Sequence, residues 1–184
     1  MGQGFAKTMF SDAAKRLQER YGSRAAYQRL AGKGESRDAL GPMEQDFIAR
    51  RDSFYLASVT VDGWPYVQHR GGPKGFLRVL DDQTLAFADF AGNKQYITAG
   101  NLETNDRVML FLMDYPNQAR LKMIGHAKWV EGDAELLAKV RVEGYKAKVE
   151  RVMVVDVVGF DWNCSQHITE RWTAEEIEAV RAGK

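Results

Sequence analysis

The chain has 184 residues, of which 45% are hydrophobic and 28% charged, a balance typical of a folded globular domain and not of a disordered protein. Lysine and arginine together number 26 against 25 aspartates and glutamates, so the net charge of +1 lacks the basic excess of most nucleic-acid-binding proteins. The only cysteine, Cys164, excludes an intrachain disulfide and a cysteine-cluster metal site, and it favours a reducing cytoplasm.

Three parts follow one another along the chain. No apolar run approaches the roughly 20 residues that a bilayer-spanning helix needs, so we expect no membrane segment. The N-terminal stretch also lacks the apolar core of a secretory signal. The residue patterns predict a helical extension over 1–50, a β-rich domain over 51–172 and a C-terminal helix over 173–184.

The first 50 residues have helical patterns. Ser11 is placed to cap a helix over 12–21, and Gly22 then breaks it before a second short helix that carries Tyr27. Pro42 suits the first turn of a third helix over 43–51, with Phe47 and Ile48 on its inward side. We expect these helices to pack on the domain that follows.

Strand-like runs begin at residue 53. The segments 53–61 and 64–70 are rich in β-branched and aromatic residues and are joined by Asp62-Gly63, which predicts a hairpin with a type I′ turn. Further strands are predicted at 76–80, 84–90, 107–114, 119–131 and 151–162, and helices at 94–103, at 134–148 and from Thr173, whose capping box Glu176 completes. Six or seven antiparallel strands with short connections indicate a barrel or a sandwich.

The segment 68–75, QHRGGPKG, is a first candidate site. A strand ends at Arg70, two glycines allow a ligand to approach the backbone, and Lys74 follows. The planar guanidinium of arginine suits a phosphate because it donates two hydrogen bonds at once. The alternative is a glycine turn flanked by two solvated cations.

The segment 87–102 is a second candidate. A strand runs into Gly92-Asn93-Lys94 and then into a helix, whose free N–H groups and partial positive charge favour phosphate. The alternative is a plain helix start capped by Asn93. Together with the first segment, it describes two basic strand ends in one small β domain.

The segment 118–131 is a third candidate, because Arg120 and Lys122 share one face of a strand. That face meets either solvent or a ligand. Gly125 in the middle of the strand predicts a bulge or a close backbone approach.

The segment 159–172 gathers aromatic and polar residues after the last strand. Cys164 and His167 offer only two metal ligands where zinc needs three or four, so we expect no metal site. A Cys–His nucleophile pair and a buried packing cysteine both remain open. His167 is the best candidate for a group on the substrate side, against the alternative of a surface histidine.

The segments 68–76, 87–112 and 119–131, in this order, resemble the pyridoxamine 5′-phosphate oxidase-like family of FMN-binding split β-barrels. The resemblance covers about residues 43–172, and the tail is similar to a flavin-nucleotide-binding subgroup. It implies a mainly β fold, a six-stranded antiparallel split β-barrel with flanking helices. It also implies a homodimer that binds two FMN molecules at the subunit interface.

The resemblance also implies roles for single residues. Arg70 and Lys94 match phosphate-binding cations of the family, and Arg120 or Lys122 would stabilise the reduced flavin from its N1/C2 edge. Trp162, Asn163 and Gln166 would approach from the partner subunit. The cofactor-binding residues implied in this way are Arg70, Gly71, Gly72, Pro73, Lys74, Phe87, Ala88, Asp89, Asn93, Lys94, Arg120, Lys122, Trp162, Asn163 and Gln166. Those on the substrate side are His167 and Arg171.

The tail lacks the Arg-x-His signature with which the true oxidases recognise pyridoxal phosphate, so we do not expect pyridoxine or pyridoxamine phosphate as substrate. We expect an FMN-dependent oxidoreductase that acts on a small molecule or on NAD(P)H. No G-x-G-x-x-G fingerprint occurs, so a nicotinamide would stack directly on FMN. The alternatives are a flavin carrier or sensor without turnover and a haem-handling split barrel, for which the sequence offers no convincing axial histidine.

Overall fold

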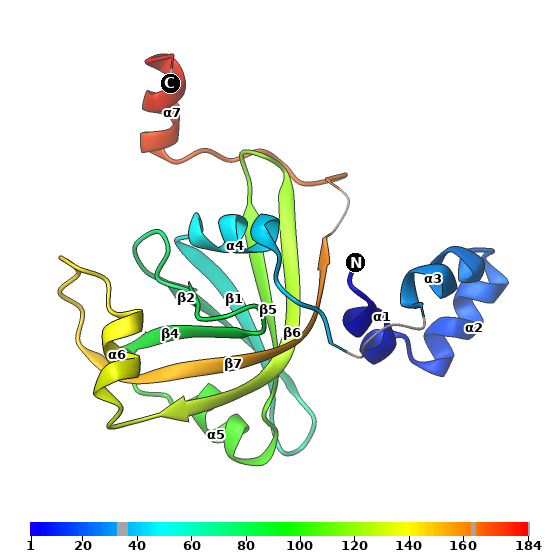
Figure 1. Cartoon of the computed structure of the whole chain (residues 1–184), viewed down its shortest axis with the longest axis horizontal. Coiled ribbons are helices and arrows are strands. Elements are labelled where there is room, and N and C mark those ends of the chain that lie inside the picture. The colour runs from blue at the N-terminus through cyan, green and yellow to red at the C-terminus, as the bar shows by residue number, and fades with distance from the viewer. Residues whose placement is uncertain (33–36, 163–164, 184) are drawn as a thin grey trace.

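A computed structural model describes residues 1–32, 37–162 and 165–183. At its centre lies a single antiparallel sheet of seven strands in the order β2-β1-β5-β6-β7-β4-β3, folded over an apolar core (Figure 1). The strands are β1 (Ser53–Val59), β2 (Pro65–Gly71), β3 (Arg78–Val79), β4 (Thr84–Phe90), β5 (Arg107–Asp114), β6 (Ala119–Val130) and β7 (Val149–Trp162). The mainly β class is confirmed, with one strand more than the six expected because the two-residue β3 pairs with β4.

The sheet is open on one side. Its edges are β2 and β3, and among the described residues no backbone pairing joins β2 to β4. The apolar core nevertheless joins the strands on the two sides of this opening. Phe54 of β1 contacts Phe76 and Phe87, with ring centroids 5.6 and 5.2 Å apart. The split between β2 and β4 is therefore a gap in the hydrogen-bonded wall of a packed barrel.

Buried and outward-facing side chains alternate along β1 and β5, as the sequence pattern of these strands predicts. On β1 and β5 the residues Phe54, Leu56, Leu110 and Leu112 are buried, whereas the residues between them face outward. The predicted irregularity at Gly125 is confirmed, since the register of β6 with β7 shifts there. A Cβ at this position would lie 2.5 Å from the carbonyl oxygen of Asp156, so only glycine fits.

The first hairpin is confirmed, but its predicted turn type is wrong. Gly63 has a positive φ of 86°, whereas Asp62 does not, and a type I′ turn requires both. The Gly63 N–H donates to the Thr60 carbonyl and the Thr60 N–H donates to the Trp64 carbonyl, so these bonds close a loop of three residues, 61–63, instead of the predicted two. A type I turn followed by a left-handed glycine joins the strands in this way.

The helices around the barrel are α4 (Pro42–Ala49), α5 (Ile97–Thr104), α6 (Ala134–Val140) and α7 (Ala174–Arg181). Phe47 and Ile48 of α4 are buried, as predicted. The prediction of a helix over 134–148 is wrong beyond Val140, because that residue is fully buried and Arg141 turns to an extended conformation. In Figure 1, α7 stands apart from the barrel at the end of the C-terminal segment.

The N-terminal helices are α1 (Gln3–Met9), α2 (Asp12–Arg20) and α3 (Arg24–Ala31). The sequence pattern predicts no helix before residue 12, so α1 is an additional helix. The Asp38 carboxylate accepts the backbone N–H groups of Gly4 and Phe5 at 2.8 and 3.1 Å, which fixes α1 against β7. Gly159 of β7 permits this contact, because a Cβ there would lie 2.2 Å from the Phe5 nitrogen. In Figure 1, α2 and α3 project from the barrel beside α1.

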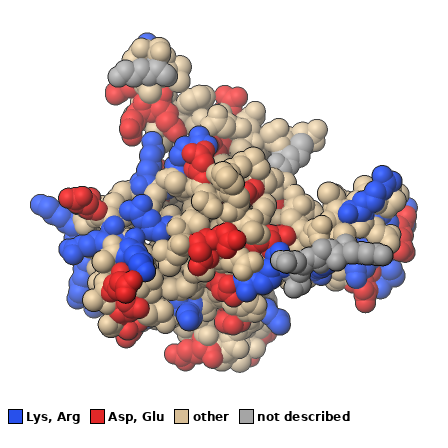
Figure 2. All heavy atoms as spheres, viewed as in Figure 1, with Lys and Arg blue, Asp and Glu red and all other residues tan. Residues whose placement is uncertain are grey.

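The surface carries both signs of charge. On the face seen in Figure 2, lysine and arginine side chains gather near α6, with carboxylates among them. No helix within the described ranges is both long and apolar enough to cross a membrane.

Candidate functional site

The gap between β2 and β4 opens into a cavity of about 290 Å³. Residues of β2, β4, β6 and β7 line it, together with the loop that leads into α5. Its side chains with polar groups include Tyr66, Gln68, Arg70, Asp89, Asn93, Lys94, Thr98 and Arg151. Because strands distant in sequence meet here, this cavity is the strongest candidate for a ligand site.

A buried ion-pair network crosses the gap. Arg70 of β2 donates from Nη1 to Asp89 Oδ1 of β4 at 2.7 Å, so side chains bridge the two strands that share no backbone ladder. Arg151 of β7 donates from Nε to the other carboxylate oxygen at 3.1 Å. Asp89 is only 5% exposed, so one carboxylate lies between two guanidinium groups inside the barrel wall.

Aromatic rings flank this network. The guanidinium of Arg151 lies 4.4 Å from the Trp129 ring centroid and 5.3 Å from that of Tyr96. Four buried side-chain donors lack an acceptor in the described part of the chain, and two of them, Arg70 Nε and Trp129 Nε1, belong to residues that line this cavity, whereas Arg78 Nε and Arg120 Nε do not. Leaving such a donor unpaired costs about 1–3 kcal/mol, so the cavity is suited to a ligand that supplies acceptor oxygens.

The loop into α5 adopts a constrained backbone. Lys94 and Tyr96 have positive φ values of 60° and 54°, which L-residues rarely adopt. The helix begins at Ile97, three residues later than predicted, and its N-cap position is Tyr96, so the interpretation of Asn93 as the cap is wrong. The Asn93 side chain instead accepts the Gln95 N–H at 3.2 Å.

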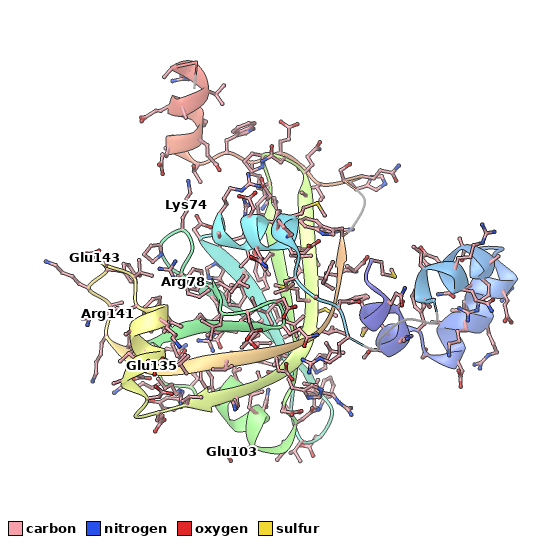
Figure 3. The ribbon with its side chains drawn as sticks, in the orientation of Figure 1. Lys74, Arg78, Glu103, Glu135, Arg141 and Glu143 are labelled. Carbon is pink, nitrogen blue, oxygen red and sulfur yellow. The ribbon has the colours of Figure 1, made fainter. Side chains whose placement is uncertain are left out.

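The structure brings the first two sequence candidates together. Seven of the predicted residues line the cavity, namely Arg70, Gly71, Phe87, Ala88, Asp89, Asn93 and Lys94. Gly72 lies against the Phe76 ring, where a Cβ would be 2.7 Å from Cγ, and the Pro73 carbonyl accepts the Phe76 N–H. Lys74 points from the loop after β2 towards α7, where its ammonium is 4.0 Å from Glu175 (Figure 3).

The third candidate lies at the other end of β6. Trp129 lines the cavity, and Arg120 is nine residues away on the same strand, about 30 Å at 3.3 Å per residue. Lys122 forms an ion pair with Asp161 at 3.0 Å and lies over the Phe5 ring of α1. Within a single copy of the chain, Arg120 and Lys122 do not line the cavity. Their roles at the flavin remain predictions.

The fourth candidate is spread over several environments. The Trp162 indole donates to Glu44 Oε1 at 2.7 Å and packs edge-on against Phe47, away from the cavity. Asn163 and Cys164 lie outside the described residues. Gln166 and His167 are exposed, and no group of three or more metal-ligating side chains occurs in the described ranges.

A second cavity of about 360 Å³ lies between the start of β1, the β5–β6 turn and the C-terminal segment. Arg171 lies over the Tyr115 ring at 4.9 Å on one side of it, and Arg51 pairs with Asp114 at 2.7 Å on another. Burial, together with the neighbouring Tyr55 phenol, raises the pKa of Tyr115, and Arg171 opposes this shift. Arg171 therefore lines this second cavity and not the first one.

Sequence reasoning missed several side chains of the first cavity, among them Gln68, Trp129 and Arg151. The period-two pattern of β2 could have identified Gln68, because this residue shares a face of the strand with Arg70. In the structure its side-chain oxygen accepts a hydrogen bond from Thr98 Oγ1 at 2.9 Å. Trp129 and Arg151 depend on how β6 and β7 pair with β4, and no local pattern specifies that pairing.

Comparisons with known proteins agree on the architecture. A family described as pyridoxamine 5′-phosphate oxidase matches residues 40–161. The crystal structure of tagged HupZ from Group A Streptococcus is 19% identical with a TM-score of 0.55, covering 72% of this chain and 99% of that one. A single-residue variant of the same streptococcal protein is 18% identical with a TM-score of 0.54, covering 67% of this chain and 99% of that one. A proposed pyridoxamine 5′-phosphate oxidase from Lactobacillus delbrueckii is 24% identical with a TM-score of 0.50, covering 67% of this chain and 93% of that one. These identities support the fold alone, and no curated protein matches the chain.

Proposed function

The chain belongs to the pyridoxamine 5′-phosphate oxidase family, and from this premise we propose that it binds FMN in the cavity between β2 and β4 and acts as an FMN-dependent oxidoreductase. Flavins are common cofactors in this family. The observation that carries the proposal is the buried, acceptor-free Nε of Arg70, set in a cavity that also holds Lys94. A phosphate group supplies the acceptor oxygens that such a donor lacks.

The residues present fit the phosphate end of FMN. Arg70 offers a guanidinium that is held in place by Asp89, and Lys94 adds a second cation from the loop before α5. Thr98 and the first turn of α5 line the same wall, where backbone N–H groups favour an anion. The rings of Phe87 and Trp129 also line the cavity and add apolar surface to it.

FMN, when bound, supplies the two-electron redox chemistry, and the protein contributes binding, orientation and electrostatics. The backbone of the strand segments Gly71–Pro73 and Phe87–Asp89 would line the flavin ring, as the family resemblance implies. The cavity of about 290 Å³ lies just below the range of 300–1,000 Å³ typical of small-molecule sites. The chain therefore holds only part of a nucleotide-sized ligand by itself.

We also propose that a second copy of the chain completes the site. The outer face of β2, β1 and β5 carries apolar side chains, with Val67 59% and Tyr55 40% exposed. The strand register places Tyr55 beside Phe111 and Ala57 beside Met109, so these residues form one continuous surface. A homodimer through this face would bury it and bring partner residues towards the flavin, including those predicted around Trp162 and Gln166.

The electron donor is proposed to be NAD(P)H or a small organic molecule that stacks on the flavin, with His167 and Arg171 on the substrate side. Since Cys164 is the only cysteine, we place the protein in a reducing cytoplasm.

Purification followed by absorption spectroscopy and mass spectrometry of the released chromophore tests the cofactor. We expect a yellow protein that releases FMN. A colourless protein that takes up no flavin, or one that shows a Soret band, would contradict the proposal and in the latter case indicate haem.

Steady-state NAD(P)H oxidation by the holoprotein tests the reaction. Turnover with oxygen or an added acceptor supports an oxidoreductase. Stable FMN binding without turnover from any donor would instead indicate a flavin carrier or sensor.

A further inference from the structure

The Asp89 carboxylate occupies the position in the cavity where an anionic ligand would meet both arginines. Its two oxygens accept from Arg70 Nη1 at 2.7 Å and from Arg151 Nε at 3.1 Å. The side chain is buried, and so are most of the two arginine side chains, which are 15% and 16% exposed. The protein therefore supplies its own anion to this site.

The net charge of the site limits how tightly it can bind a second anion such as phosphate. Arg70 and Arg151 contribute two positive charges and Asp89 removes one. The charges of the other charged residues of the lining, Lys94 and Glu150, cancel each other. Glu131 lies 4.0 Å from Arg151 on the solvent side and is 73% exposed. A phosphate that reaches both guanidiniums must share them with the carboxylate. Like charges a few ångströms apart in a partly desolvated site repel strongly.

Asp89 does not use every donor of the two guanidiniums. Arg70 keeps a buried Nε without an acceptor in the described part of the chain, and Arg151 lies over Trp129 with Asp89 bound to its Nε. Arg70 can therefore bind a second anion without leaving Asp89, and Arg151 can do so through its Nη nitrogens, since Asp89 holds its Nε. The carboxylate orients the pair and at the same time reduces its attraction for phosphate.

We propose that Asp89 is a specificity-determining residue of this site, and that Arg151 is its second phosphate-facing cation. The proposal rests on the proposed FMN function and deepens it. The Asp89 charge weakens the hold on the doubly negative tail of FMN, so that the flavin exchanges with solution instead of staying permanently bound. The neutral part of the flavin is unaffected by this charge.

Fluorescence titrations of Asp89→Asn and Arg151→Gln with FMN and with riboflavin test the proposal. Asp89→Asn keeps the shape of the side chain and removes its charge, so we expect FMN to bind about 10- to 100-fold more tightly and riboflavin within about threefold of the unaltered protein. Arg151→Gln removes a cation, and we expect FMN to bind about 10- to 100-fold more weakly with riboflavin again unchanged.

Asp114→Asn is the matched control, because Asp114 also forms a buried 2.7 Å ion pair with an arginine, at the second cavity. It should lower the thermal unfolding midpoint without changing either affinity. An Asp89→Asn protein that binds FMN more weakly, or an Arg151→Gln protein with unchanged FMN affinity, would overturn the proposal.

Stabilisation by inorganic phosphate distinguishes a failure of the proposal for Asp89 from a failure of the proposed FMN function. The thermal unfolding midpoint of each variant is compared in sodium phosphate and in sodium chloride of equal ionic strength. We expect phosphate to stabilise Asp89→Asn more than the unaltered protein, and Arg151→Gln less. If no protein binds either flavin, the FMN function fails, and the phosphate result still decides whether Asp89 competes with an anion. If Asp89→Asn gains nothing from phosphate, the role of Asp89 is refuted.

Discussion

Two buried arginine–aspartate pairs lie at two different cavities of the barrel, and they differ in how completely their donors are used. Arg51 bonds the Phe47 carbonyl, the Met113 carbonyl and the Asp114 carboxylate, and its guanidinium lies 4.6 Å from the Phe47 ring centroid. Asp114 in turn accepts two N–H groups of Asn117. Each nitrogen of this guanidinium has an acceptor from the protein itself.

The Arg70–Asp89 pair has the same 2.7 Å geometry, but Arg70 Nε and the nearby Trp129 Nε1 lack acceptors in the described part of the chain. Buried polar groups are nearly always satisfied, so the exceptions need an explanation. An ion pair by itself therefore does not identify a binding site. What distinguishes the first cavity is that two unsatisfied donors line it beside the ion pair.

The largest effect that would test this difference is on stability. Asp114→Ala leaves the Arg51 charge without its carboxylate, and we expect the free energy of unfolding to fall by about 3–5 kcal/mol in urea titrations. FMN affinity of the folded protein should not change. A stable variant that has lost FMN binding would show that the second pair serves the ligand.

Arg70→Ala should give the largest loss of binding. We expect FMN affinity to fall by about 2–4 kcal/mol, which is about 30- to 1,000-fold, because a charge-assisted donor pair to the phosphate is removed. Calorimetric titration measures it, with circular dichroism as the check on folding. Riboflavin affinity is the internal control, and an equal loss for riboflavin would argue against a phosphate contact.

Trp129→Phe should have an intermediate effect. It removes the orphaned indole N–H and retains a ring, so we expect the stability of the free protein to be unchanged or slightly raised. Flavin should bind about three- to tenfold more weakly, as expected for the loss of one hydrogen bond. Unaltered affinity would mean that this donor does not face the ligand.

Lys94→Ala should have the smallest effect, because Lys94 is exposed to solvent. We expect FMN to bind about two- to fivefold more weakly at low salt, and the difference to shrink as salt is added. A loss as large as that of Arg70→Ala would show that the loop before α5 closes over the phosphate.

The strands and the two cationic strand ends can be predicted because both depend on local patterns. Alternating hydrophobicity indicates the strands, and Arg70 and Lys94 each lie where a strand ends and a loop begins. Local patterns do not specify which strand ends share one side of a barrel. This is why the sequence does not separate Arg120 and Lys122 from the first cavity, although they lie at the far end of β6.

Pairing between distant strands explains the residues that sequence reasoning missed. Arg151 is 62 residues from Asp89, and only the β4–β7 register brings them together. Helical periodicity overestimates the length of α6, which ends at the extended Arg141 directly after Val140 has packed in a cluster with Ala86 and Ala88. The periodicity alone continues to residue 148.

The central claim is that the cavity between β2 and β4 recognises the phosphate of FMN. Paired titrations of the unaltered protein with FMN and riboflavin in one buffer test it most directly. We predict that FMN binds at least about tenfold more tightly, and that this difference disappears in Arg70→Ala. Equal affinities for the two flavins, or no binding of either, would contradict the claim.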